Sequence, residues 1–289
     1  MTDAAVRPLR IAGRYDLGPV IGRGGTGVVR AAWDRRERRL LAAKVLPADN
    51  AALAQAAHER ALELAHPHLL GTVGWVAEDG IVLLLAPLAT GGSLRDQVEQ
   101  AGAPPPAVVH AVLDQVLAGL AGLHERGWVH RDVTPANVLL DAGTGPWRVR
   151  LGDLGIAAPE GTPQPPGTAP GTAGFLAPEA AGGAPVDRRQ DLYAVGVLGR
   201  RLLALGRPPP AARSLLAVLE QLADPAPWRR PGSADDARAL LRETARQLPP
   251  AHAPEVPARA TTPPAPGWIP AARAASAWFR PSRRAGPAR

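Results

Sequence analysis

A glycine-rich segment that leads into a single lysine constrains the fold of this chain more than any other feature. Residues 21–29 read IGRGGTGVV and carry glycines in the G-x-G-x-x-G spacing. The apolar run over residues 40–46 contains Lys44, which is the only lysine among 33 basic residues. In so arginine-rich a chain, a lone lysine indicates a position that needs a compact ammonium group. A glycine-rich loop, a strand and an inward lysine form a layout that can hold nucleotide phosphates.

The glycine spacing by itself does not specify phosphate binding. The chain has 31 glycines, so an ordinary glycine-rich hairpin would also produce the spacing. A dinucleotide-binding loop requires a helix directly after the glycines, whereas residues 28–33 (VVRAAW) have strand character. We therefore set the dinucleotide interpretation aside and keep the plain hairpin as the alternative to phosphate binding.

The bulk composition is that of a globular protein. With 289 residues and 46% hydrophobic content, the chain can bury one large core or two lobes. It has no cysteine, which excludes disulfides and thiolate metal sites. No stretch reaches the ~18–20 apolar residues that span a bilayer, and the N-terminus lacks the apolar core of a signal peptide. We therefore expect a cytoplasmic protein without a transmembrane segment.

The positive charge is concentrated near the C-terminus. The formal net charge is +7, and residues 250–289 supply +5 of it through six arginines and one glutamate. The rest of the chain has little excess positive charge, so we expect no nucleic-acid binding. The same region is rich in proline and has two interpretations. It is a solvated tail without a core, or a docking segment that uses Trp268, Trp278 and Phe279.

Periodicity divides the chain into two parts and predicts an α+β fold. Strand patterns over 15–17, 28–33 and 40–44, a helix over 50–65 and a hairpin over 75–85 predict a small sheet with one helix. After residue 92 the chain turns mainly helical. We expect helices over 94–100, 106–126, 189–205, 211–223 and 233–247, a hairpin over 138–151 and an irregular segment over 158–172. Residues 1–13 would form a leader and residues 248–289 a disordered tail.

Polar motifs in the second part point to cation and hydroxyl chemistry. Residues 130–140 read HRDVTPANVLL, and Asp132 and Asn137 can face one small site from a shared loop. The carboxylate can accept a hydroxyl proton, and the amide oxygen can bind a divalent cation. Asp153 follows in the sequence Asp-Leu-Gly and is suited to Mg²⁺ that bridges phosphates. Residues 171–179 (GTAGFLAPE) are the last of these motifs along the chain.

Taken in order, these segments resemble the eukaryotic-type protein kinase family in its bacterial, Hanks-type serine/threonine branch. The glycine loop, the strand lysine, the H-R-D loop, Asp-Leu-Gly in place of D-F-G, and Ala-Pro-Glu all appear. The resemblance covers residues 14–247. It implies a bilobal kinase-like fold, with an N-lobe over about 14–87 and a mainly α-helical C-lobe over about 88–247. The N-lobe would be an antiparallel sheet plus one helix. ATP and Mg²⁺ would bind in the cleft, with Mn²⁺ as the alternative cation.

The resemblance also implies catalytic roles for the matching residues. Asp132 would orient the acceptor hydroxyl and take its proton, and Lys44 would hold the α- and β-phosphates of ATP. Asn137 and Asp153 would bind Mg²⁺. Thr134 belongs to the same catalytic loop, but the family usually has lysine at this position. The loss of that cation weakens the stabilisation of the transferring phosphoryl group.

Further residues would bind ATP or support the site. By the resemblance, ATP would contact Ile21, Gly22, Arg23, Gly24, Gly25, Thr26, Gly27, Val29, Ala42, Lys44, Pro87, Ala89 and Leu139. Asp191 would anchor the catalytic loop, and Arg230 would pair with Glu179. Thr172 would help to shape the acceptor site, and His130 would pack beneath the loop.

Two features of the regulatory residues stay open. We expect Glu59 to be the helix glutamate that pairs with Lys44, which requires a helix shortened by two residues. Glu63 lies at the usual distance along the chain but close to the end of the helix. A third alternative is that this charge is absent. Thr162 and Thr168 are the candidate phosphorylation sites, because an arginine before the catalytic Asp is typical of kinases activated by such a phosphate. Either threonine fits equally well as a loop residue without a switch role.

The sequence therefore predicts a protein serine/threonine kinase that autophosphorylates through a transient dimer and acts on protein substrates. The alternative is a pseudokinase, an ATP-binding interaction or scaffold module with little transfer activity. A small-molecule phosphotransferase is a third interpretation. Residues 171–179 speak against it, since they resemble a platform for protein substrates.

Overall fold

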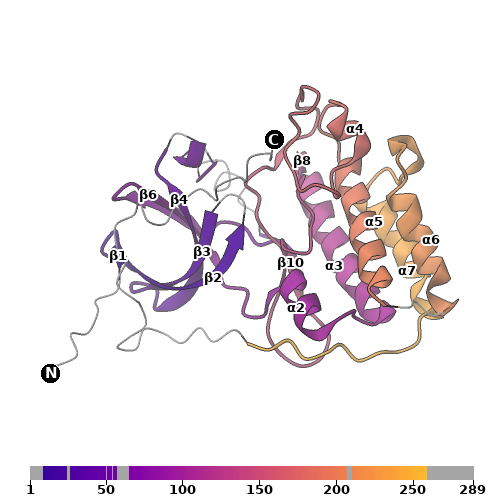
Figure 1. The fold of residues 1–289 in the computed structure, drawn as a ribbon, viewed down its shortest axis with the longest axis horizontal. Helices are drawn as coiled ribbons and strands as arrows, with labels where there is room; N and C mark the ends of the chain where they lie inside the picture. Colours follow the sequence, from indigo (N-terminus) through magenta and orange to yellow (C-terminus); the bar gives the residue numbers. More distant parts are fainter. Residues whose placement is uncertain are drawn as a thin grey trace, which may run out of the picture. The chain divides into compact units, whose positions relative to one another are not determined.

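The chain folds into two compact units. The structure, a computed structural model, describes residues 9–24, 27–49, 51–53, 55–56, 65–206 and 210–258. The first unit, here the sheet unit, takes in the described residues up to 56 together with 72–88. The second, the helical unit, takes in residues 65–71 and the described residues from 89 to 258. Figure 1 shows the ribbon of both.

The sheet unit is one antiparallel sheet. Its strands follow the order β1-β2-β3-β4-β6-β5, and every pair of neighbours is antiparallel, as the sequence predicts. The strands are β1 (Arg10–Ile11), β2 (Tyr15–Gly24), β3 (Gly27–Asp34), β4 (Arg39–Pro47), β5 (Gly74–Glu78) and β6 (Ile81–Pro87).

Turn chemistry explains the hairpins of this sheet. β5 and β6 are joined by the two residues Asp79 and Gly80, both with positive φ, at 48° and 78°. An Asp-Gly pair with two positive φ values is the preferred two-residue hairpin, because its twist matches that of the strands. The glycine-rich segment is the tip of a longer hairpin, in which Gly24 pairs with Gly27.

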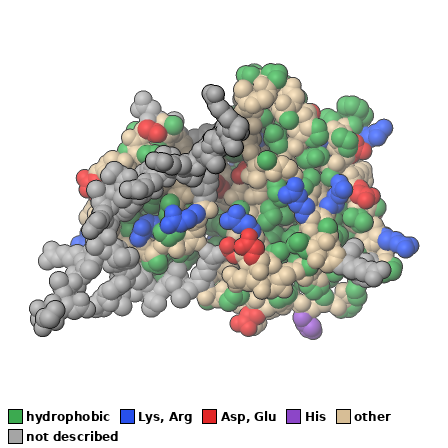
Figure 2. Space-filling view, viewed as in Figure 1, with side chains coloured by type: hydrophobic (Ala, Val, Ile, Leu, Met, Phe, Trp, Pro, Cys, Tyr) green, Lys and Arg blue, Asp and Glu red, His purple; other side chains and the backbone are tan. Residues whose placement is uncertain are grey.

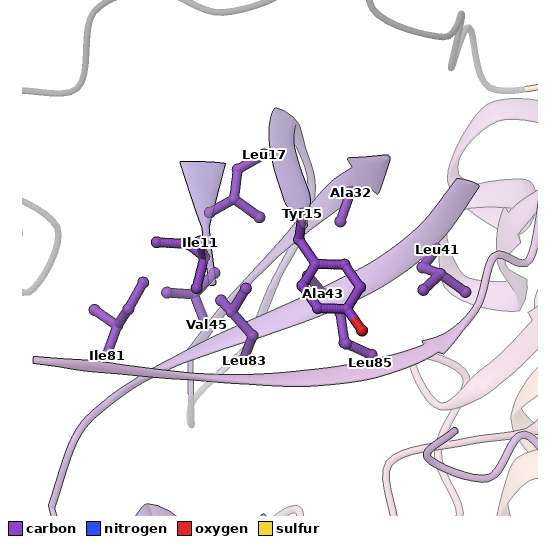
Figure 3. Packing of buried hydrophobic residues seen from close by; sticks show 10 residues of the cluster. All are labelled: Ile11, Tyr15, Leu17, Ala32, Leu41, Ala43, Val45, Ile81, Leu83 and Leu85. Atoms are coloured by element: carbon purple, nitrogen blue, oxygen red, sulfur yellow. The ribbon is translucent and has the colours of Figure 1, made fainter. Parts of the chain in front are cut away.

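Alternation along β4 assigns its side chains to two faces. Leu41, Ala43 and Val45 are buried in the main core of the sheet unit, together with residues of β1, β2, β3 and β6. Figure 3 shows these side chains and those of Leu83 and Leu85 converging on one interior. Because successive strand residues point to opposite faces, Ala42 and Lys44 belong to the other face of the sheet.

That second face carries a smaller core. Leu46, Val82 and Leu84 pack there against Ala52 and Ala56, which are helical. Asp49 caps the start of this helix, since its side-chain oxygen accepts the N–H of Ala52 at 2.7 Å. An aspartate at this position satisfies a backbone donor that the helix leaves unpaired. Lys44 therefore shares its face of the sheet with the contact to this helix.

The helical unit contains six α-helices among its described residues. They are α2 (Leu94–Ala101), α3 (Pro106–His124), α4 (Pro178–Ala181), α5 (Arg189–Ala204), α6 (Arg213–Leu222) and α7 (Ala234–Glu243). Short 3₁₀ turns cover η1 (Pro210–Ala212), η2 (Pro227–Arg229) and η3 (Ala245–Gln247). The serines expected to cap α2 and α7 do so, since Ser93 accepts from Asp96 N–H and Ser233 from Asp236 N–H.

Short strands lie beside the helices. β9 (Val138–Leu140) pairs with β10 (Val149–Leu151) and with β7 (Gly92–Ser93), which confirms the expected hairpin. β8 (Trp128–Val129) pairs with β11 (Ala158–Pro159). The start of the segment expected to be irregular is therefore a short strand, because Ala158 finds an antiparallel partner in Val129.

α3 is the central helix of this unit. It packs against α5, α7 and β10, and twelve of its nineteen residues are buried. By length and composition it could cross a membrane, and it is the one such helix among the described residues. Most of its apolar window is buried inside the helical unit. A core helix that is covered on several sides is apolar nearly all round.

The segment after η3 also departs from expectation. Part of the predicted disordered tail is described, and residues 249–258, here the C-terminal strap, pack on the helical unit (Figure 1). Trp147 donates its indole N–H to the carbonyl of Pro254 at 2.7 Å. Val256 is 1% exposed and forms an antiparallel bridge with Gly143. Residues 259–289, with Trp268, Trp278 and Phe279, lie outside the described part of the chain.

Candidate active site

A buried carboxylate on α5 holds the loop that begins at His130. Asp191 is fully buried and accepts the N–H of His130 at 2.8 Å and the N–H of Arg131 at 2.7 Å. The ring nitrogen Nε2 of His124 lies 2.8 Å from the same carboxylate. Burial alone would raise the pKa of Asp191, but the hydrogen bond and charge of His124 and the backbone donor of Arg131 outweigh it and lower the pKa. The carboxylate therefore stays ionised, and it holds the backbone at His130 and Arg131.

This anchoring stabilises an unusual backbone conformation. Arg131 has φ at +72°, in the left-handed region that disfavours residues with a side chain. Such a conformation persists where the surrounding contacts over-determine it, and it is frequent at functional sites. The conformation turns the chain sharply just before Asp132.

His130 links this loop to the one that carries Asp153. It is fully buried, its Nδ1 accepts the N–H of Asp132 at 3.2 Å, and its Nε2 lies 3.1 Å from the carbonyl of Gly152. These two partners assign the proton to Nε2. Both nitrogens are occupied by backbone groups, so His130 has the packing role expected for it and not that of a base.

Three predicted site residues meet at the Asp132 carboxylate. Asn137 donates its Nδ2 to the carbonyl and to Oδ2 of Asp132, both at 2.8 Å. Thr172 donates its N–H at 3.1 Å and its hydroxyl at 2.6 Å to Oδ1. Both carboxylate oxygens are therefore fixed in direction by donors from two separate segments. A positioned carboxylate within hydrogen-bond reach of a threonine hydroxyl has the geometry of a general base.

Asn137 and Asp153 are brought close by the backbone. Gly152 donates its N–H to the carbonyl of Asn137 at 2.9 Å, and Asp153 is the next residue. Asp153 also has a left-handed φ, at +61°. With its nitrogen directed at Asp132, Asn137 has its amide oxygen to offer a cation, and Asp153 has a carboxylate. These are the oxygen donors that Mg²⁺ prefers.

The donor set fits a cation that is shared with a substrate. Among the described residues no group of three His, Cys, Asp or Glu side chains could enclose a metal ion. Mg²⁺ in phosphoryl transfer is commonly held by one or two carboxylates together with the phosphates and water. One carboxylate and one amide oxygen match that pattern.

Thr134, the departure from the family pattern, is part of the loop's turn. It is 3% exposed, and its carbonyl accepts the N–H groups of Asn137 at 3.0 Å and Val138 at 3.2 Å. This turn places Asn137 on the same side of the loop as Asp132. A buried threonine side chain supplies no positive charge at this position.

The predicted phosphate-binding residues of the sheet unit lie on three adjacent strands. Ile21, Gly22, Arg23 and Gly24 end β2, and Gly27 and Val29 begin β3. Lys44 on β4 lies in register with Val29 on one side and Leu84 on the other. Gly25 and Thr26 fall outside the described residues, as do both candidate helix glutamates, Glu59 and Glu63.

The glycines of this hairpin differ in what requires them. A Cβ on Gly27 would lie 2.8 Å from the carbonyl oxygen of Val45, so the close approach of β4 excludes any side chain. A Cβ on Gly22 would meet only Val29, at an ordinary 3.6 Å. The fold therefore requires a glycine at position 27, whereas the described residues leave room for a Cβ at position 22.

The remaining predicted ATP contacts are divided between the units. In the sheet unit Ala42 pairs with Ala86, and Pro87 ends β6 opposite Leu41. In the helical unit Ala89 accepts the N–H of Gly92 at 3.4 Å, and Leu139 lies half-buried on β9.

Glu179 and Arg230 form the expected pair. The guanidinium donates to both carboxylate oxygens, at 2.6 and 2.8 Å, and the Arg230 side chain has no exposed surface. Arg230 also donates to the carbonyls of Asp224 and Arg189 and lies over the ring of Tyr193. This pair joins α4, α5 and the turn before α7, and so supports the segment that ends at Glu179.

The segment between Asp153 and Thr172 holds a contact that the sequence did not indicate. Arg131 donates to the side-chain oxygen of Gln164, which is 8% exposed. The hydroxyls of the two candidate phosphorylation sites have other partners. Thr162 donates its hydroxyl to the carbonyl of Pro159, and Thr168 to that of Pro165. No sequence pattern marks Gln164, because a glutamine between prolines is typical of an exposed loop.

The family comparison agrees with this geometry. Residues 15–230, about three quarters of the chain, match the protein kinase domain. The chain belongs to the protein kinase family. Its antiparallel sheet unit and helical unit are the two lobes of a kinase domain, and the fold predicted from the sequence is confirmed.

Relatives of this kinase domain carry serine/threonine kinase names. The chain is 35% identical over 235 residues to serine/threonine-protein kinase PknD of Mycobacterium tuberculosis, covering 78% of this chain and 35% of that protein. It is 37% identical over 237 residues to serine/threonine-protein kinase PknL of Mycobacterium bovis, with coverages of 78% and 58%. It is 32% identical over 248 residues to serine/threonine-protein kinase PkaA of Streptomyces coelicolor, with coverages of 78% and 45%. The kinase domain thus spans between about a third and three fifths of these relatives.

Proposed function

We propose that this chain is a protein serine/threonine kinase that transfers the γ-phosphoryl group of ATP to serine or threonine hydroxyls of proteins. The observation that carries the proposal is the Asp132 carboxylate, fixed on one side by Asn137 and on the other by Thr172. A pure binding module gains nothing from a carboxylate aimed by donors on two segments. The names of the relatives support the same chemistry.

In this proposal Asp132 accepts the proton of the acceptor hydroxyl. Thr172 lies within hydrogen-bond distance of the same oxygen that would receive the proton. An incoming serine or threonine hydroxyl can take the place of the Thr172 hydroxyl at Oδ1, while the Thr172 N–H keeps the carboxylate oriented. The contribution of the loop is therefore position and charge, in keeping with a phosphoryl transfer that needs little covalent help from the protein.

The remaining roles follow the family. Lys44 holds the α- and β-phosphates of ATP, and the backbone at Gly22, Gly24 and Gly27 approaches them closely. Asn137 and Asp153 hold Mg²⁺, which when bound neutralises charge on the phosphates. Mn²⁺, with the same preference for oxygen ligands, would serve as a substitute. Because Thr134 stands where the family usually has a lysine, the catalytic loop has one positive charge fewer. The rate of transfer is therefore expected to be modest.

Substrates and location belong to the proposal as well. We infer protein substrates, cytoplasmic location and autophosphorylation through a transient dimer, with Thr162 and Thr168 as acceptors. On the face shown in Figure 2, basic side chains of the helical unit lie among acidic and apolar ones. A mixed surface of this kind does not favour nucleic acid as a partner.

The test is phosphate incorporation from Mg-ATP into the chain and into a general protein acceptor, followed by intact mass. We expect incorporation by the unaltered chain and none by Asp132→Asn or Lys44→Ala. ATP binding by calorimetry separates the outcomes. If ATP binds and Asp132→Asn leaves that binding unchanged, but no phosphate is transferred, the chain is a pseudokinase.

A further inference from the structure

Gln164 joins two loops through its side-chain amide. Its side-chain oxygen accepts a hydrogen bond from Nη2 of Arg131. Its side-chain nitrogen donates to the carbonyl of Ala184 at 3.0 Å. The amide thus spans from the residue before the catalytic Asp132 to the segment that follows α4. Because Gln164 is buried, both ends of its amide need partners, and both have one.

Arg131 directs both terminal nitrogens of its guanidinium toward the segment between Asp153 and Thr172. Nη1 donates to the carbonyl of Ile156 at 3.2 Å while Nη2 contacts Gln164. Burial lowers the pKa of Arg131, with the charge of Asp191 opposing that shift. A guanidinium that is partly removed from water gains more from each fixed acceptor than an exposed one does.

Residues 160–162 of this segment are also held by hydrogen bonds, without any phosphorylation. Gly161 donates its N–H to the carbonyl of Val186 at 2.7 Å, and Val186 donates to the carbonyl of Thr162 at 2.9 Å. Arg188 donates its Nε to Glu160 at 2.9 Å, which lowers the pKa of that carboxyl. The stretch 184–188 therefore holds the segment at residues 160–162 and at Gln164 itself.

We propose that Gln164 is a positioning residue that keeps Arg131, and through it Asp132, in place in the unphosphorylated chain. A phosphate on this segment could supply the same acceptor to Arg131, but the neutral amide already does so. Transfer activity therefore does not require a phosphate on Thr162 or Thr168, although either can be an acceptor. The proposal rests on the proposed kinase function for its effect on rate, and on the structure alone for its effect on the loop.

Three variants test the amide. Gln164→Met keeps the approximate size of the side chain and removes both hydrogen bonds. Gln164→Glu keeps an acceptor for Arg131 and removes the donor to Ala184. Thr162→Ala combined with Thr168→Ala removes both candidate phosphorylation sites. Each chain is treated with phosphatase and its mass is checked before use.

The first readout is kinetic. We expect Gln164→Met to lower kcat by about ten- to a hundredfold with little change in the KM for ATP, since small displacements of a catalytic loop have effects of that size. Gln164→Glu should recover most of the loss. The double threonine variant should keep the rate of the unaltered chain. Loss of rate in the double variant, or an inactive phosphatase-treated chain that regains activity on phosphorylation, would overturn the proposal.

The second readout does not depend on transfer. Amide hydrogen exchange of the peptides that cover 129–137 and 158–168 should rise in Gln164→Met. In the double threonine variant the peptide that covers 129–137 should exchange as it does in the unaltered chain. Arg131→Met should raise exchange in the same two peptides, and combining it with Gln164→Met should add little, as for two residues that act through one contact. If the chain transfers no phosphate, the proposed function fails while exchange still decides the role of Gln164. Unchanged exchange in Gln164→Met would refute that role.

Discussion

Thr172 donates both its backbone N–H and its hydroxyl to a single oxygen of Asp132, at 3.1 and 2.6 Å. The two residues are forty positions apart, so the contact fixes the segment before α4 against the catalytic loop. A donor pair aimed at one carboxylate oxygen sets its direction more firmly than either donor alone. In the proposed mechanism the acceptor hydroxyl arrives at this same oxygen.

Removing the Thr172 hydroxyl is therefore expected to reduce transfer more than ATP binding. Thr172→Ala should lower kcat by about ten- to a hundredfold through loss of positioning, with the KM for ATP nearly unchanged. Thr172→Ser keeps the hydroxyl and should lose much less. Steady-state kinetics on a protein acceptor measures both. Equal losses in the two variants would assign the role to the methyl group instead.

The two glycines of the hairpin should respond differently to alanine. Gly27→Ala places a Cβ against the carbonyl of Val45 and should lower the free energy of unfolding by about 1–3 kcal/mol. Gly22→Ala meets no close atom, so stability should change by less than about 0.5 kcal/mol. Its affinity for ATP should nevertheless fall. Urea unfolding and calorimetry measure the two effects, and a stable Gly22→Ala variant with unaltered ATP affinity would contradict the phosphate role.

Neighbouring arginines provide a matched test of the buried ion pair. Arg230→Met leaves Glu179 without its partner in a largely buried place, and should cost about 3–5 kcal/mol of stability. Arg229 is 70% exposed and lies 3.8 Å from Asp224. Arg229→Met should change stability by no more than about 0.5 kcal/mol. Chemical denaturation of both variants decides, and similar losses would mean that the pair is not the source of stability.

The Asp191 carboxylate should make part of the stability dependent on pH. Its pKa is lower in the folded chain than the ordinary 3.8, so folding favours the ionised form. The stabilisation is therefore complete above about pH 5 and is lost as the pH falls below 3.8. Asp191→Asn should lower the free energy of unfolding at pH 7 by at least about 2 kcal/mol. The difference from the unaltered chain should shrink toward pH 3, and curves that stay parallel would argue against this linkage.

The C-terminal strap should contribute measurably to stability. Val256→Ala removes buried methyl groups and should cost about 1–3 kcal/mol. Gly91→Ala would place a Cβ 2.3 Å from a methyl carbon of Val256 and should displace the strap. In a chain that ends at residue 248, Gly91→Ala should cost less than in the full chain. Thermal unfolding of the full and shortened chains, each with and without Gly91→Ala, tests the contact. If the losses from Gly91→Ala and from removal of the strap simply add, the two effects are independent.

Much of the fold could be predicted because local signals agreed with it. The alternation in β4, the turn at Asp79 and Gly80, and the serine caps of α2 and α7 each specify one element. The catalytic loop could be placed because residue types at fixed spacing have a known chemistry. The contact of Arg230 with Glu179 followed from the family pattern, and the structure has it.

Other features depend on contacts between distant residues and carry no local mark. Gln164 lies among prolines, so only the position of Arg131 reveals that it is buried. Val256 is a single apolar residue in a proline-rich stretch, and its burial depends on the missing side chain of Gly91. The alanine-rich helix after residue 50 gives few apolar residues of distinctive size, so the sequence alone could not set the phase of Glu59 or Glu63.

The path of the C-terminal strap also sets the point on the helical unit to which a tethered partner would be attached. Residues 249–258 lead away from η3 and reach the turn between β9 and β10, where Val256 meets Gly143. A domain joined beyond residue 258 would be tethered at that turn and not at the end of α7. Its effective concentration would be highest for surfaces around the turn, and shortening a linker there would change which surfaces it can reach.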